Sequence, residues 1–193
     1  FPELPQLETG ARAWVISMDP DGGSSETGFS DIDLWGKYQF LDDPILLSGG
    51  IMFTLPTGGE KIIHPRASGE VNFEIFGALR YYVTDVFALI GHTGIRINAD
   101  ADFKSGGTKY KADGETQFEI GGGTIFDVTP ELDILGELNI ANEAYNDSDN
   151  DIELTGGVNY SFNEYFAGRG GIGIGFDDGA PDFELILGAS ALF

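Results

Sequence analysis

Apolar and polar residues alternate along most of this chain, and turn-forming residues interrupt the alternation at intervals. In residues 31–41, for example, Ile32, Leu34, Tyr38 and Phe40 fall on one face, with charged and amide residues between them. A period of two residues is typical of a β-strand with one apolar and one polar face. No helical period of 3.6 residues competes with it. The pattern therefore predicts an all-β protein.

The alternation predicts ten strands, at residues 11–18, 31–41, 45–55, 70–83, 86–98, 118–126, 132–140, 152–162, 166–176 and 183–193. The connections between them are short at 42–44, 84–85, 129–130 and 163–164. They are long and polar at 19–28, 56–69, 99–113, 141–151 and 177–182. Alternating short and long connections are typical of an antiparallel up-and-down β-barrel that spans the outer membrane, with its tight turns in the periplasm.

An even number of strands brings both chain ends to the side of the short turns. We therefore predict that both termini are periplasmic. Residues 1–10 are expected to form an N-terminal periplasmic tail, and residues 11–193 a single outer-membrane β-barrel. Residues 1–5 do not combine a basic segment with an apolar run, so an exported chain would already have lost its signal peptide.

The alternation also fits a soluble lipocalin-like or avidin-like barrel, but four features favour the membrane. The apolar face continues over five or more alternate positions per strand, which matches the ~9–11 residues that a tilted strand needs to cross a bilayer. Aromatic residues on this face gather near both strand ends, as membrane interfaces favour. The opposite face carries mid-strand charges. The last strand ends at Phe193 and resembles the C-terminal signal that the barrel assembly machinery reads.

Composition narrows the functional classes. The net charge of −22, with only 10 Lys and Arg, argues against nucleic acid as a partner. The 15 Phe residues argue against disorder, despite the acidity. The absence of Cys excludes disulfides and thiol chemistry. No run of 18 apolar residues is present, so a transmembrane helix is excluded.

The polar face of the strands supplies the side chains expected inside the barrel. Counted from the short turns at ~3.3 Å per residue, Lys37, Arg80 and Arg169 lie low, and acidic residues dominate higher up. The predicted lumen-lining residues are Asp33, Lys37, Glu74, Arg80, His92, Arg96, Glu119, Asp133, Glu137, Glu153, Arg169 and Glu184.

Two interpretations of this charged interior remain open. The residues could form an ion-pair network that fills a narrow barrel, or they could act as a filter for a polar solute. Five glycines on the inward face favour a passage, because they leave free space along the wall, although glycine also permits tight strand curvature. They are Gly121, Gly123, Gly171, Gly173 and Gly175.

Catalysis and cofactors find little support. Neither His64 nor His92 is tied by spacing to a nucleophile, so we predict no enzyme and no cofactor. Asp147, Asp149 and Asp151 place carboxylates at alternate positions, as calcium sites often do, but they do not match an EF-hand loop. A solvated acidic loop is the simpler interpretation, and divalent ions could bridge such loops to lipopolysaccharide.

Two strings add a family resemblance. Residues 27–40, which read TGFSDIDLWGKYQF, are followed by Leu55-Pro56-Thr57-Gly58. Together they resemble the outer-membrane family labelled as a meta-pathway phenol-degradation or transporter protein, and residues 181–193 look like its terminal strand. The resemblance implies uptake of small solutes, with aromatic compounds as one class. It implies no catalytic residues.

Two functions follow for a protein of the bacterial outer membrane. The first is a passive channel or uptake barrel for small solutes. The alternative is a non-transporting envelope barrel that acts as an anchor or binds other envelope proteins in a larger assembly. The expected surroundings are outer-membrane lipid, lipopolysaccharide and the barrel assembly machinery.

Overall fold

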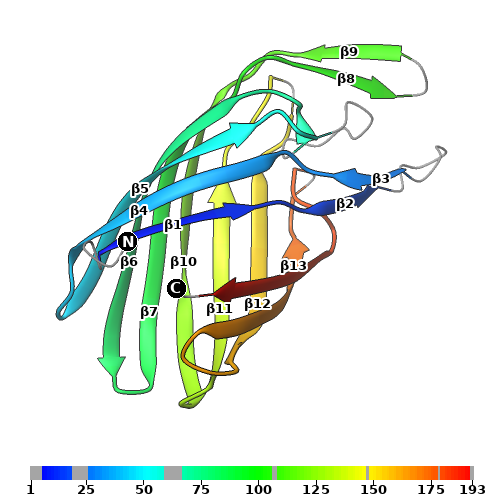
Figure 1. Cartoon of the computed structure of the whole chain (residues 1–193). Helices are drawn as coiled ribbons and strands as arrows, with labels where there is room; N and C mark the ends of the chain where they lie inside the picture. Colours follow the sequence, from blue (N-terminus) through cyan, green and yellow to red (C-terminus); the bar gives the residue numbers. More distant parts are fainter. Residues whose placement is uncertain are drawn as a thin grey trace.

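The computed structural model describes residues 6–18, 26–58, 67–105, 108–146, 148–177 and 179–191, which form one antiparallel sheet of ten strands with two additional hairpins (Figure 1). In sheet order the strands are β1 (Leu7–Arg12), β4 (Ile32–Leu41), β5 (Ile45–Leu55), β6 (Asn72–Thr84), β7 (Phe87–Ile97), β10 (Thr116–Thr129), β11 (Leu132–Ala141), β12 (Asp151–Ser161), β13 (Phe166–Gly175) and β14 (Glu184–Ala191). The predicted all-β, antiparallel, ten-stranded architecture is confirmed. The described residues contain no helix long and apolar enough to cross a membrane.

The first predicted strand, residues 11–18, is divided in two. Strand β1 ends at Arg12, and Val15–Met18 form β2, which pairs with β3 (Glu26–Phe29) in a separate hairpin. Trp14 marks the change of partner, because its backbone N–H donates to the hydroxyl of Ser30 and its carbonyl accepts from the N–H of Ser30. Strand β1 also begins at Leu7, so residues 7–10, expected in a tail, belong to the sheet.

The long connection between β7 and β10 is not a structureless loop. It contains a hairpin of β8 (Ala101–Ser105) and β9 (Thr108–Ala112), which lies at the end of the sheet away from the short turns (Figure 1). The alternation of residues 101–112 was too brief to separate this hairpin from its polar surroundings. Among the ten strands of the main sheet, the predicted succession of short and long connections holds throughout.

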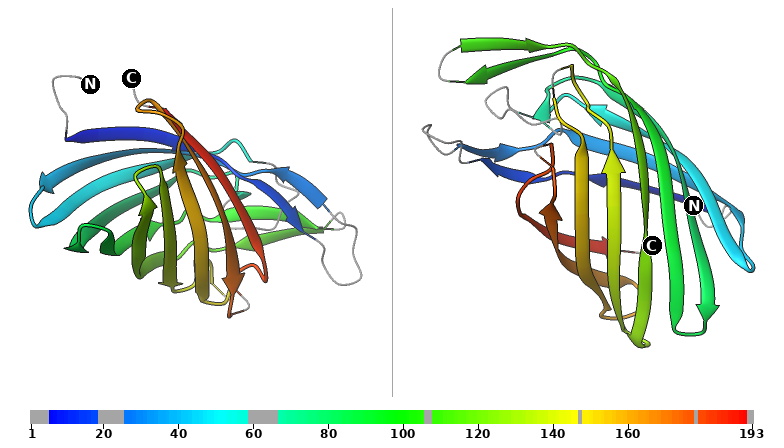
Figure 2. Two further views of the ribbon diagram at one scale, coloured as in Figure 1. Left: turned by 90° about the horizontal axis from the view of Figure 1, so that it is seen from below. Right: turned by 180° about the vertical axis from the view of Figure 1, so that it is seen from behind.

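The sheet curls into a half-barrel with an apolar convex face and a polar concave face (Figure 2). On the convex face Ile75 is 57% exposed, whereas on the concave face Asp33 is 4% exposed. Side chains of the concave face converge and meet across an intervening strand. Arg96 on β7 reaches Thr54 on β5 over β6, and such contacts identify the inside of the curl.

Both described chain ends lie at the end of the sheet that carries the short turns. Leu7 is opposite Tyr38, three residues before the end of β4. Ala191 is opposite Phe166, the first residue of β13. The long connections and both additional hairpins lie at the opposite end (Figure 1). One end of the sheet therefore carries the short turns and the described chain ends, and the other carries the long connections.

Candidate functional site

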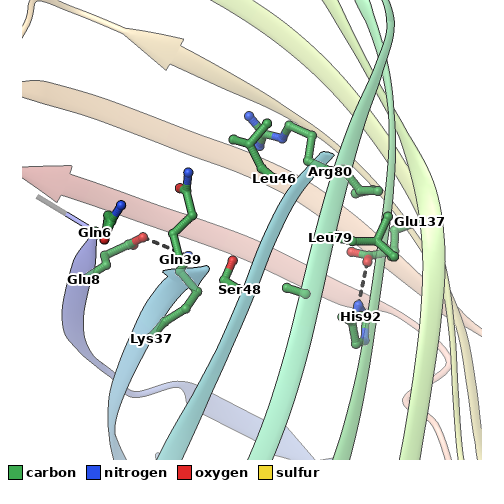
Figure 3. Close-up of a pocket in the computed structure, with 13 residues that line it drawn as sticks. Gln6, Glu8, Lys37, Gln39, Leu46, Ser48, Leu79, Arg80, His92 and Glu137 are labelled. Atoms are coloured by element: carbon green, nitrogen blue, oxygen red, sulfur yellow. Dashed lines mark hydrogen bonds and ion pairs between the residues drawn. The ribbon is translucent and has the colours of Figure 1, made fainter. Parts of the chain in front are cut away.

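A cavity of about 410 Å³ lies on the concave side of the half-barrel (Figure 3). Strands β4 to β7 supply most of its wall, and β1 and β11 supply the rest. Most of its lining is polar, including Gln39, Ser48 and the charged side chains of Lys37 and Arg80. Glu8 on β1 forms an ion pair with Lys37, with 2.8 Å between its Oε2 and the Lys37 Nζ. The cavity therefore offers hydrogen-bonding groups and charges of both signs.

His92 forms a bridge across three strands at the edge of this cavity. Its Nε2 lies 2.8 Å from Oε1 of Glu119 on β10, and its Nδ1 lies 2.9 Å from Oε1 of Glu137 on β11. An ionised carboxylate only accepts hydrogen bonds, so with both carboxylates ionised the bridge uses both ring nitrogens of His92 as N–H donors. The bridge thus ties β7, β10 and β11 together on the inside of the curl.

The imidazole of His92 can cross β10 because the residue beneath it is Gly121. These two residues are opposite each other in the β7–β10 ladder. A Cβ built on Gly121 would collide with the ring of His92 and with the amide oxygen of Asn139. The missing side chain is therefore what permits the bridge.

A second polar cluster lies nearer the long connections. Arg12 Nε donates to Asp33 Oδ2 at 2.9 Å, and Thr54 Oγ1 donates to Asp33 Oδ1 at 2.6 Å. Thr54 Oγ1 also accepts from Arg96 Nη2 at 3.0 Å. Arg96 lies opposite Glu74 in the β6–β7 ladder. This level of the concave face is filled by side chains that form hydrogen bonds and an ion pair with one another.

The remaining predicted lumen residues are distributed along the same face, and several of them form hydrogen bonds with neutral groups. Asp133 accepts from the amide of Asn159 at 3.1 Å. Glu153, which is buried, accepts from the hydroxyl of Thr155 at 2.6 Å. Arg80 donates to the Tyr82 hydroxyl at 3.3 Å. Arg169 and Glu184 lie on β13 and β14, near the edge of the sheet.

The interpretation that inward glycines leave free wall space is wrong, because neighbouring groups occupy that space. The carboxylate of Glu153 lies over Gly173, at 2.7 Å from the site of a Cβ. The backbone of Pro181 similarly abuts Gly175, and the ring of His92 covers Gly121. At Gly123 and Gly171 the carbonyls of neighbouring strands leave no room. These glycines allow close packing rather than a wider passage.

Two functional residues escaped the sequence analysis. Arg12 and Glu8 lie on the inward face of β1 and pair with Asp33 and Lys37. The sequence signal was present, because Glu8 and Arg12 stand two residues before and after Gly10. In a strand that starts at Leu7, residues two positions apart lie on the same face. For Glu8 this signal was hidden by the assignment of residues 1–10 to a tail, whereas Arg12 lay in the predicted strand 11–18 and was not included among the lumen-lining residues.

Asp31 was also missed, and it organises the connection between β5 and β6. This carboxylate is buried, and it accepts from the backbone N–H of Thr57 at 2.9 Å, Gly58 at 2.7 Å and Gly69 at 2.9 Å. The hydroxyl of Ser68 donates to it as well, at 3.3 Å. Four donors on one carboxylate hold both ends of this connection in place.

The β8–β9 hairpin packs against the connection between β11 and β12. Ala101 and Phe103 form a small apolar cluster with Ala144 and Tyr145, in which the two aromatic rings meet edge to face at 5.7 Å. Burial raises the pKa of the Tyr145 hydroxyl. Two of the long connections are therefore packed together rather than independently solvated.

The described part of the chain contains no group of three or more His, Asp and Glu side chains placed to bind a metal. Asp149 and Asp151 lie within the described residues, and neither belongs to such a group. Asp147, His64 and the terminal Phe193 lie outside the described residues.

No protein-family model matches the chain, and no curated protein matches it by sequence. Among the solved structures that share its fold, the COG4313 outer membrane channel from Pseudomonas putida F1 has a TM-score of 0.74 at 12% identity, with 97% of this chain and 78% of that chain covered. The NanC porin has a TM-score of 0.57 at 10% identity, with 97% and 99% covered. At these identities the likeness concerns the fold alone, and it confirms the prediction of an antiparallel β-barrel fold of the kind found in these two proteins.

Proposed function

We propose that this protein is a passive channel for small polar solutes in the bacterial outer membrane. The observation that carries the proposal is the cavity of about 410 Å³ between Lys37, Arg80, His92 and Glu137, inside a sheet whose outer face is apolar. An apolar outer band around a polar interior is the arrangement of an outer-membrane barrel that conducts. Both structural neighbours carry the name of a channel or porin. We assign no catalytic role to any residue.

The two ends of the sheet suggest an orientation for this channel. Short turns face the periplasm in outer-membrane barrels, and longer loops face outward. We therefore place both termini, the barrel entry near Gln39 and the short turns on the periplasmic side. The acidic long connections would then lie among the lipopolysaccharide headgroups. Membrane insertion would require the barrel assembly machinery.

Aromatic compounds remain a candidate solute class, on the strength of residues 27–40 and their resemblance to the meta-pathway family. Within the concave face, Trp35 and Phe76 supply partly buried aromatic surface beside polar groups. Such a combination suits a solute with one polar and one apolar side. The resemblance to the meta-pathway family is carried by residues 27–40, 55–58 and 181–193.

Conductance across a planar lipid bilayer tests the channel directly. We expect discrete current steps from the purified full-length chain. The charge-reversal variant K37E/R80E is expected to shift ion selectivity towards cations, because it replaces two cationic groups of the cavity wall. E164Q, in the exposed short turn between β12 and β13, is the control. A flat trace at all voltages would refute the channel.

A second candidate is a non-transporting barrel that anchors an envelope assembly. The filled level around Arg12, Asp33, Thr54 and Arg96 favours it, because paired side chains that fill a barrel make it rigid rather than permeable. In that case E74Q/E119Q would lower thermal stability and leave solute uptake unaltered. Uptake that changes with the same variant would instead favour the channel.

A further inference from the structure

Buried side chains are concentrated in the half of the sheet that carries the long connections. Among the described residues, Ala88 is the one buried side chain that lies near the short turns. The others lie at the opposite end of the strands, as Thr54 does, or in the long connections, as Ser68 and Tyr145 do. The cavity of about 410 Å³ lies nearer the short turns, where Arg80 lines it. The interior therefore has free space at one end and is filled at the other.

Three of the long connections contribute buried side chains beyond the ends of the main strands. They are the connection between β5 and β6, the β8–β9 hairpin and the connection between β11 and β12, all at the end of the sheet away from the short turns (Figure 1). We call their residues 67–69, 101–103 and 143–146 the cap. Connections normally run exposed over a protein surface, but Ala67, Ala101 and Ala144 in the cap are at most 4% exposed. The cap is therefore a packed structure.

Tyr145 lies where the segments of the cap meet. Its ring packs edge to face on Phe103 of β8 at 5.7 Å, and its backbone forms an isolated antiparallel bridge with Gly114, which follows β9. Burial raises the pKa of its hydroxyl, and Ser68 and Arg96 beside it act in the opposite direction. Ser68 belongs to the connection between β5 and β6, and Arg96 lies on the concave face of β7. The phenol thus extends from the connection between β11 and β12 past β10 to the concave side of the sheet.

The contacts that hold the cap together are weaker than those of the sheet. Strands β8 and β9 pair with each other and not with the main sheet, so their displacement would break none of its ladders. Their apolar contact with the connection between β11 and β12 is the small cluster of Ala101, Phe103, Ala144 and Tyr145. Within the described part of the chain, the buried Tyr145 hydroxyl has no hydrogen bond of good geometry. A segment with few buried apolar contacts and an unsatisfied polar group opens more readily than a paired sheet.

We propose that the cap closes the barrel interior at the end of the long connections, and that Tyr145 holds it closed. This inference rests on the proposed channel function. The arrangement described above is the closed state, in which the contact between Phe103 and Tyr145 keeps β8 against the connection between β11 and β12. Solute passes when this contact opens and β8 and β9 move away from the interior. Access to the cavity from the short turns does not depend on the cap.

A thiol beneath the cap reports on its opening without reference to conduction. Met52 lies on the concave face of β5, three residues before the strand ends at the long connection, and is 4% exposed. The chain contains no Cys, so M52C introduces a single reactive thiol. Full-length M52C protein and its variants are reconstituted in lipid vesicles and treated with a charged, water-soluble thiosulfonate reagent. The rate of labelling at Cys measures how often the cap opens.

The substitutions in this M52C protein act on the proposed contact. We expect Y145A to raise the labelling rate at least about tenfold, because loss of a buried aromatic ring is strongly destabilising. F103L is the milder change and should act in the same direction, so it decides the question if Y145A does not fold. Y145F removes only the hydroxyl that lacks a hydrogen bond, and its rate should not exceed that of M52C alone. Y165A, in the exposed short turn between β12 and β13, is the matched control.

Unaltered labelling in both Y145A and F103L would overturn the proposal. An equal increase in Y165A would do the same, because it would show a general loosening of the barrel. Conductance of the same proteins in planar bilayers separates the cap from the channel, and we expect Y145A and F103L to raise the fraction of time spent open. Faster labelling without current in any variant would refute the channel and keep the cap. Current with unaltered labelling would keep the channel and refute the closing role of Tyr145.

Discussion

The imidazole of His92 occupies the space that a side chain on Gly121 would fill, and this relationship makes the three-strand bridge to Glu137 possible. His92 and Gly121 are opposite each other on β7 and β10. Glu137 lies one strand farther, on β11. At this position the contact across β10 needs a residue without a side chain in between, and the concave curvature brings the two outer partners together. One glycine therefore decides how three strands are held on the inside.

We predict that Gly121→Ala destabilises the protein by about 1–3 kcal/mol, the range for overpacking a filled site. The new methyl group would collide with the His92 ring and force it off Glu119 and Glu137. Urea unfolding of the protein in lipid vesicles measures the change. Gly136→Ala is the matched control, because no atom lies within 4 Å of its Cβ site. Equal effects of both substitutions would contradict the role assigned to Gly121.

Asp31→Asn is predicted to loosen the connection between β5 and β6. The amide group of Asn keeps one acceptor oxygen but turns a second donor towards the N–H of Gly69 and the hydroxyl of Ser68, which now donate to a carboxylate. Hydrogen bonds to a charged group contribute about 1.5–3 kcal/mol each, so we expect a loss on the order of 3 kcal/mol. Limited proteolysis should show faster cleavage in this connection. D182N changes an exposed carboxylate and should leave the cleavage rate unaltered.

The alternation of residues was sufficient to predict the fold, because each residue's parity decides its face. Asp33 and Leu34 are neighbours in sequence, and the structure buries one on the concave face and exposes the other on the convex face. Parity does not decide how far one strand is displaced along the next, and the contacts of the interior depend on that register. His92 was predicted to face inward, but its position between Glu119 and Glu137 follows only from the ladders of three strands.

The edges of the sheet were the least predictable part. Strand β1 is short and polar. Its inward side chains Glu8 and Arg12 are recognised as part of the interior only from their ion pairs with Lys37 and Asp33 on β4. Asp31 was predicted as the first residue of the strand 31–41, and nothing in the neighbouring sequence indicates that its carboxylate is buried. Its burial results from the return of the chain at Gly69, 38 residues later. Long-range closure of this kind leaves no local pattern.

The cluster at the β8–β9 hairpin is predicted to loosen at alkaline pH. Burial raises the pKa of Tyr145, so the folded cluster holds the phenol neutral at a pH where the unfolded segment ionises. Its stability is therefore fully present below the ordinary phenol pKa of about 10 and is lost as the pH rises through the raised value. Hydrogen exchange of the hairpin amides as a function of pH measures the loss. In Y145F this step should disappear, and its persistence would assign it to another group.

The substitution Leu79→Arg tests whether the convex face of the sheet contacts lipid, as in a membrane barrel, or water, as in a soluble barrel. Leu79 lies in the middle of β6 on the convex face and is 43% exposed. An arginine at the bilayer midplane of a membrane barrel costs about 2–4 kcal/mol, and it costs about 0–1 kcal/mol near the interface. Val128→Arg is the matched control, because Val128 is 44% exposed and lies at the short-turn end of β10. We expect a larger loss of unfolding free energy in vesicles for L79R than for V128R. In water both sites would tolerate arginine equally, so equal and small losses would contradict a lipid-facing convex surface.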